Sequence, residues 1–112
     1  MKIYFKSKKL EKNLTEPRNM VKKYGILAKK INQRLSELKA AYNLEVMKTI
    51  PAARCHELKE NRKGQFAVDV SGKERMIFIP NHDPIPKIND GGMDWTRITE
   101  IKILSIEDYH QR

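Results

Sequence analysis

Residues 65–79 constrain the fold most, because two β-patterned segments lie one turn apart there. Residues 65–70 read QFAVDV, in which an aromatic or β-branched residue recurs at every second position. This period of two is typical of a half-buried strand. Ser71 and Gly72 have turn chemistry, and the β-rich run RMIFI follows at hairpin distance. The segment therefore predicts a β-hairpin with Arg75 at the start of its second strand.

Basic side chains lie just before and within this hairpin: Arg54, Lys59, Arg62, Lys63 and Arg75. A guanidinium group binds two phosphate oxygens at once, whereas a lysine ammonium group acts as a point charge. A cationic surface on a rigid sheet therefore favours chemistry on phosphate. Two plainer interpretations stay open. Lys59 and Arg62 are equally well explained as solvated loop charges, and Arg75 can pair with Asp69 across the hairpin.

The positive charge of the chain is concentrated in its first part. Residues 1–64 hold 17 Lys and Arg against 6 Asp and Glu, and residues 65–112 hold 6 against 8, within a net charge of +9. This asymmetry favours a polyanionic partner whose binding weakens with salt, although lysines on helix exteriors also keep a protein soluble. With 112 residues, we expect one domain spanning residues 1–112 around a single core.

Several protein classes are disfavoured by what the sequence lacks. No apolar run approaches the roughly 18 residues of a membrane helix, and the opening MKIYFKSKKL is not a signal peptide. We therefore expect a cytoplasmic protein without membrane partners. The single cysteine, Cys55, allows neither an internal disulfide nor a thiolate metal cluster. The three histidines lack zinc spacing and no glycine-rich phosphate loop is present, so catalysis without a metal is expected.

The N-terminal part has a helical pattern with one interruption. A helix is expected to begin at Lys8 after the N-cap Ser7. Pro17 interrupts its apolar pattern, and Thr15 can cap a new start with Pro17 in the first turn. Gly25 is expected to close this helix as a left-handed cap.

Residues 26–42 carry the strongest helical signal in the chain. An apolar stripe is expected to face the core: Leu27, Ile31, Leu35, Leu38 and Tyr42. The basic residues between them are expected to face solvent: Lys29, Lys30, Arg34 and Lys39. This helix and the preceding one would then form a helix hairpin laid against the sheet.

Two further strands are expected, at residues 2–5 and 98–106. In the second of these, Ile101 and Ile103 are expected on the face opposite to Ile106. The chain order strand, helix, helix, strand, strand, strand predicts an α+β fold, in which the helices cover one face of a mainly antiparallel four-stranded sheet.

Cleavage of RNA needs no metal, because the 2′-hydroxyl of the substrate is the nucleophile. An enzyme must then remove the 2′ proton, neutralise charge on the phosphorane and protonate the leaving oxygen. The second task suits the basic residues around the hairpin: Lys59, Arg62 and Arg75. His110 suits proton transfer, with Asp108 to orient it and Tyr109 to bind phosphate or stack on a base. A histidine this near a C-terminus is, however, often disordered.

The segment HELKENRKGQFAVDVSGKERMIF and the terminal EDYH resemble the RelE/HigB family of type II toxin–antitoxin toxins, which cleave mRNA, and in particular its HigB-like branch. The resemblance implies a RelE-like fold and a ribosome-dependent endoribonuclease that needs no cofactor. It places the catalytic residues at Lys59, Arg75, Asp108, Tyr109 and His110. Beside them, we expect three basic residues to bind phosphate groups of the substrate RNA: Arg54, Arg62 and Lys63.

The resemblance also implies a set of partners. These are mRNA on the ribosome, ribosomal RNA, and a cognate antitoxin that carries a helix-turn-helix domain. Operator DNA would be bound only through the antitoxin. One alternative is a non-catalytic protein of the RelE/ParE fold that acts by binding, through gyrase inhibition or regulatory binding to an antitoxin. A general RNA-binding module is disfavoured, because no aromatic stacking platform is present.

Three features depart from the family pattern. Glu60 and Asn61 stand where the branch often has Gly-Asp, which predicts a differently shaped loop after Lys59. The hairpin turn carries no basic residue at positions 71 and 72. Residues 80–97, rich in proline and glycine, form a longer connection than compact members have, and Trp95 is expected to anchor its far end.

Overall fold

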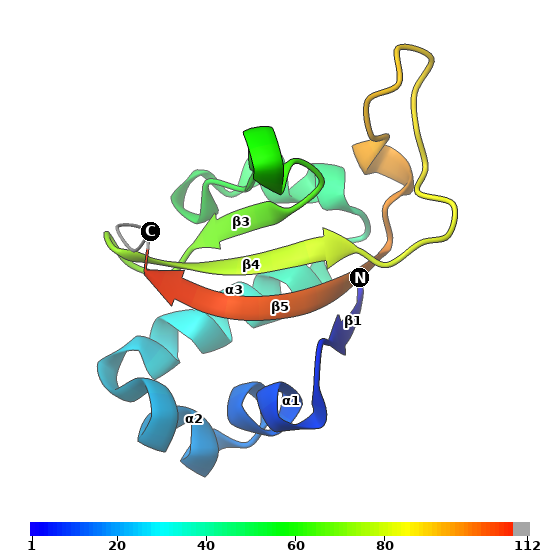
Figure 1. Ribbon diagram of the computed structural model, residues 1–112. Coiled ribbons are helices and arrows are strands. Elements are labelled where there is room, and N and C mark those ends of the chain that lie inside the picture. Colours follow the sequence, from blue (N-terminus) through cyan, green and yellow to red (C-terminus); the bar gives the residue numbers. More distant parts are fainter. Residues whose placement is uncertain (109–112) are drawn as a thin grey trace.

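The computed structural model describes residues 1–108 and shows a twisted sheet with the α-helices on one side of it (Figure 1). The helices are α1 (Lys8–Thr15), α2 (Pro17–Tyr24) and α3 (Ala28–Ala40). The strands are β1 (Lys2–Phe5), β2 (His56–Glu57), β3 (Phe66–Asp69), β4 (Glu74–Pro80) and β5 (Glu100–Asp108). They form one sheet in the order β1-β5-β4-β3-β2, in which only the β1–β5 pair is parallel. The α+β class and the hairpin are therefore confirmed.

The sheet has five strands rather than the predicted four. The additional strand is β2, where His56 pairs with Ala67 and Glu57 with Phe66. Two residues are too few to show a period of two, so this strand left no pattern in the sequence. The basic segment before the hairpin is consequently tied to the sheet edge.

The N-terminal helices begin and end close to the predicted positions. Ser7 caps α1 by accepting a hydrogen bond from the Leu10 amide at 3.1 Å, as predicted. The N-cap of α2 is Glu16 rather than Thr15. Gly25 ends α2 with a φ of 57°, which favours glycine. A 3-10 turn at Gly25–Leu27 then precedes α3, so residues 1–108 contain three α-helices, one more than the predicted chain order counts.

The main core lies between α3 and one face of the sheet (Figure 1). The fully buried side chains include Ile31, Leu38, Phe66, Met76, Phe78, Ile101 and Ile103. Tyr42 does not join them, since α3 ends at Ala40 and the Tyr42 side chain is 82% exposed. The predicted apolar stripe is therefore one residue too long.

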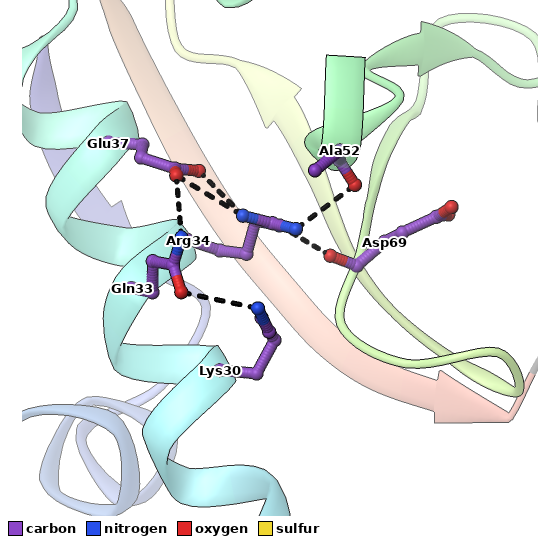
Figure 2. A network of polar contacts seen from close by, with 6 residues as sticks. All are labelled: Lys30, Gln33, Arg34, Glu37, Ala52 and Asp69. Carbon is purple, nitrogen blue, oxygen red and sulfur yellow. Dashed lines mark hydrogen bonds and ion pairs between the residues drawn. The ribbon is translucent and has the colours of Figure 1, made fainter. Parts of the chain in front are cut away.

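Arg34 is the largest departure from the expected helix pattern, because its side chain is 3% exposed rather than turned to solvent. Figure 2 shows how its guanidinium group joins three parts of the chain. Nε donates to the Asp69 carbonyl at 2.7 Å, Nη2 donates to the Ala52 carbonyl at 3.0 Å, and Nη1 bonds the Glu37 carboxylate at 2.9 Å. These partners satisfy a charge that would otherwise be costly to bury.

A register shift changes which side chains of β5 face the core. Phe78 of β4 pairs with Ile103, whereas Ile77 pairs with Ser105, so Leu104 is an extra residue in β5. Such a bulge reverses the alternation beyond it. Ile106 therefore packs on the same core as Ile101 and Ile103, and the prediction that it lies opposite to them was wrong.

The other face of the sheet carries a small apolar cluster formed by Leu58, Ala67 and Ile77, with Leu104 packed against it. None of the three α-helices contributes to this cluster within the described chain. We call this side of the sheet the open face.

Residues 80–97 project from the sheet as a long loop (Figure 1, yellow to orange). Lys87 and Met93 bridge its two arms, and Trp95 packs edge-on against Phe66 with ring centroids 5.1 Å apart. The predicted anchoring role of Trp95 is thereby confirmed. No helix in residues 1–108 combines the length and apolar character needed to cross a membrane.

Candidate active site on the open face of the sheet

Arg75 occupies the centre of a charged row across the sheet. Its register partners are Asp69 on β3 and Glu107 on β5. Side chains alternate between faces along a strand, so Arg75 shares the open face with Ile77, two residues further on. The strand pairing therefore places the Arg75 side chain between two acidic neighbours on a rigid support.

Glu107 connects Arg62 to this row. The Arg62 guanidinium donates to both Glu107 carboxylate oxygens, at 2.8 and 3.0 Å, and the Ser105 hydroxyl donates at 2.7 Å. The hydrogen bond from Arg62 is the main reason that the pKa of Glu107 is lowered, and the charge of Arg75 acts in the same direction. The carboxylate is thus held ionised between two arginines.

Asp69 forms the corresponding contact on the other side of Arg75. Its carboxylate accepts a hydrogen bond from Arg54 Nε at 2.9 Å. Arg54 follows the 3-10 turn Pro51–Ala53 and has a left-handed backbone with a φ of 45°. Its carbonyl lies 2.7 Å from His56 Nδ1, which ties this turn to β2. The backbone thereby directs Arg54 toward the open face.

The loop between β2 and β3 positions Arg62 and two lysines. Arg62 Nε donates to the Gln65 side chain at 3.0 Å, and the Gly64 amide donates to the Glu57 carboxylate at 3.0 Å. Lys59 and Lys63 flank the 3-10 turn Glu60–Arg62 and are exposed. Glu60 has a φ of 58°, a conformation that glycine adopts more readily. Glutamate is accommodated here with some backbone strain.

The structure brings Arg54, Arg62 and Arg75 onto one face through the carboxylates of Asp69 and Glu107. It does not bring Asp108 to that face. Asp108 pairs with Glu74, and strand alternation directs these two residues away from the side on which Arg75 and Glu107 lie.

Tyr109 and His110 lie outside the described residues, so their predicted positions beside Arg75 stay predictions. Sequence reasoning also missed a residue of the row, Glu107, although it belongs to the EDYH string. Its alternation with Ser105 on a strand opposite Arg75 was the available signal, but the register shift at Leu104 obscured it.

This array favours binding of a phosphate group over binding of a metal. Three guanidinium groups face two carboxylates, and two lysines stand at the rim. A phosphate that reaches Arg62 has to replace Glu107, because both ligands use the same forked donors. No group of three His, Cys, Asp or Glu side chains suited to a metal occurs in residues 1–108.

The Arg62–Glu107 contact makes stability depend on pH. Because folding lowers the pKa of Glu107 from its usual 4.5, the contact stabilises the fold above that pH and loses its effect as the pH falls below it. We expect the stability difference between the wild type and Glu107→Gln to shrink between pH 6 and 3, as urea unfolding would measure. The control is Glu11→Gln, an exposed carboxylate on α1. A constant difference would contradict this account.

Cys55 adjoins this site but is not part of it. Burial raises the pKa of the Cys55 thiol to about 12, while the charge of Lys48 opposes this effect. The thiolate fraction at pH 8 is then on the order of a thousandfold lower than in an unfolded chain. We expect iodoacetamide to label the folded protein at least a hundredfold more slowly than the urea-unfolded protein. Equal labelling rates would show that the thiol is accessible and ionised.

The N-terminal helices, the mostly antiparallel five-stranded sheet and the open face define a RelE/YoeB-like fold. Among solved structures, the chain is similar to the Staphylococcus aureus YoeB–YefM complex, with a TM-score of 0.55, 21% identity and coverage of 99% of this chain and 98% of that chain. It is also similar to a YoeB/ParE toxin from Agrobacterium tumefaciens, with a TM-score of 0.51, 10% identity and coverage of 98% and 100%.

These likenesses establish the fold. No protein-family model and no curated protein matches the sequence. The predicted RelE-like fold is therefore confirmed, whereas the HigB-like branch stays a prediction.

Proposed function

We propose that this chain is the toxin of a type II toxin–antitoxin system and cleaves mRNA on the ribosome without a metal. The observation that carries the proposal is the row Arg54–Asp69–Arg75–Glu107–Arg62 on the open face. The fold, which the chain shares with YoeB/ParE toxins, supports it. Clustered arginines on a rigid sheet are suited to neutralising charge on a phosphorane.

In this proposal, the arginines and the C-terminal residues have separate tasks. Arg75 and Arg62 bind the scissile phosphate, Lys59 adds charge at the rim, and Arg54 and Lys63 bind neighbouring phosphates. His110 transfers a proton and Tyr109 contacts the phosphate or a base. Strand alternation directs Asp108 to the other side of β5, so we assign it no task at the phosphate. The 2′-hydroxyl loses its proton and its oxygen attacks phosphorus while the bond to the 5′-oxygen breaks and that oxygen gains a proton. The products then carry a 2′,3′-cyclic phosphate and a 5′-hydroxyl group.

The site lacks a strong base among the described residues of the row, because Glu107 is held ionised with a lowered pKa by Arg62. A weak base becomes effective when the substrate is held in an attacking geometry. We therefore propose that the ribosome supplies this orientation, and that free RNA is a poor substrate.

The proposal includes a protein partner. The Staphylococcus aureus protein was solved as a complex of YoeB with YefM. By analogy, we propose that a cognate antitoxin binds this chain and neutralises it, and that the antitoxin provides the contact with operator DNA.

Incubation of the purified protein with one message, either in a translating reaction or free in the same buffer, tests ribosome dependence. We expect cleavage of the translated message at least a hundredfold faster than that of the free message, because orientation by the ribosome is worth several orders of magnitude. Primer extension measures both rates. Equal rates would refute ribosome dependence, and growth arrest without any cleavage would favour the alternative in which the chain acts by binding alone.

A further inference from the structure

A second basic surface lies far from the open face, between α1 and α2. It is a cleft of about 580 Å³ lined only by lysine and asparagine: Lys8, Lys9, Lys12, Asn13, Asn19, Lys22 and Lys23. We call it the lysine cleft. Figure 1 shows α1 and α2 at the end of the molecule away from β3 and the β2 edge.

Helix periodicity explains how the lysines gather there. Lys8 and Lys12 are four residues apart on α1, as are Lys9 and Asn13, so both pairs lie on one side of the helix. Leu14 is buried on the opposite side of α1, and Met20 is the buried residue of α2 and does not line the cleft. Burial of the apolar sides therefore turns both lysine-bearing sides toward the same space.

The positive charge of the cleft is offset by no ion pair within the described part of the chain. The acids nearest in sequence are Glu11 and Glu16, and Glu16 accepts a hydrogen bond from Asn19 of the lining at 3.2 Å without pairing with a cleft lysine. Like charges this close repel one another, so a bound polyanion would relieve a repulsion that the protein itself leaves in place.

We propose that the lysine cleft binds the phosphate backbone of structured RNA, independently of base sequence. A protein partner is disfavoured, because protein interfaces are anchored by apolar and aromatic side chains and the lining has neither. Base stacking is excluded as the mode of recognition for the same reason. Lysines without such neighbours make contacts that position a nucleic acid without reading its sequence.

The choice of RNA over another polyanion rests on the proposed function. The cleft would hold RNA while the open face engages the message at a separate place. The two surfaces carry charge in different ways. The arginines of the open face are paired with carboxylates, whereas the cleft lysines form no ion pair in residues 1–108. The cleft is therefore expected to contribute affinity and salt dependence, but no cleavage chemistry.

Binding of a fluorescent 20-base-pair RNA duplex tests this inference by anisotropy across a series of salt concentrations. All proteins carry Arg75→Ala to keep the RNA intact. The cleft variant combines Lys9→Gln, Lys12→Gln and Lys22→Gln. Its control combines changes at three exposed lysines elsewhere, with the same loss of charge: Lys29→Gln, Lys39→Gln and Lys87→Gln. Thermal unfolding confirms that both variants fold.

We expect the cleft variant to bind at least about tenfold more weakly at low salt, with a slope of log K against log salt reduced by roughly two to three, because each lost phosphate contact removes about 0.7–0.9. The control should change the slope by less than one. As a second measurement, amide shifts of the protein upon titration with RNA should concentrate on α1 and α2.

Equal losses in the two variants would overturn the inference, since net charge alone would then explain binding. Unchanged RNA binding, or a selective loss of binding to poly-glutamate, would overturn it as well. The two proposals fail separately. If the wild-type protein is not toxic but the cleft variant loses RNA affinity as expected, only the toxin function is refuted. If the wild-type protein is toxic but the cleft variant binds RNA normally, only this inference is refuted.

Discussion

Arg75→Ala is expected to abolish the toxicity of this chain. Arg75 stands between Asp69 and Glu107 on the open face, where its charge can stabilise the phosphorane. Loss of a comparable transition-state donor costs about a hundredfold to a thousandfold in rate. Cells that produce the wild-type chain should stop growing, whereas cells that produce equal amounts of the variant should grow normally. Growth curves measure toxicity, and immunoblotting measures the amount of protein produced.

The matched control for this variant is Lys102→Ala. Lys102 is a cation of β5 at the other end of the strand, paired with Ile79 rather than Arg75. It should leave toxicity unchanged. His110→Ala, at a position outside the described residues, should be tolerated like Arg75→Ala if the C-terminal residues take part. Full toxicity of Arg75→Ala would remove the open face as the site of cleavage.

Arg34→Met should produce a large loss of stability, because Arg34 carries a buried charge. The guanidinium group satisfies the carbonyls of Asp69 and Ala52 and offsets the charge of Glu37 (Figure 2). Methionine keeps the apolar stem but leaves these groups unpaired in a buried place. Removal of one partner from such a buried pair costs about 3–5 kcal/mol. Urea unfolding at pH 7 measures the change.

Two further variants test whether the loss comes from the contacts of Arg34. Lys30→Ala, which loses one hydrogen bond to Gln33 at 3.2 Å, should cost less than about 0.5 kcal/mol. The double variant Arg34→Met with Glu37→Gln should recover part of the loss, because it removes the unpaired charge. A loss below about 1 kcal/mol for Arg34→Met would show that the network contributes little.

The elements that the sequence predicted well are those with local causes. The hairpin has its period of two and a turn at residues 71 and 72, Ser7 caps α1, and Gly25 takes the positive φ expected of it. Trp95 could be assigned as an anchor because a large aromatic side chain at the end of a long loop is stabilised by burial against the core.

The errors share a different origin, since each depends on partners distant in the chain. Arg34 occupies a polar position of its helix, but the carbonyls that receive it come from residues 18 and 35 positions further on. The register shift at Leu104 is a property of two strands together. Glu107 was missed for this reason, so the sequence identified the cations of the candidate site but not the carboxylates that organise them.

The chemical form of the cleaved ends tests the central proposal most directly. A message is translated in the presence of the purified protein, which locates the cut site. A second message carries a single 2′-deoxynucleotide at that site and is translated in the same way. We predict 2′,3′-cyclic phosphate and 5′-hydroxyl ends on the natural message and no cleavage of the substituted one, because the nucleophile has been removed. Ends with a 3′-hydroxyl group, or undiminished cleavage of the deoxy-substituted message, would contradict attack by the substrate's own 2′-oxygen on the open face.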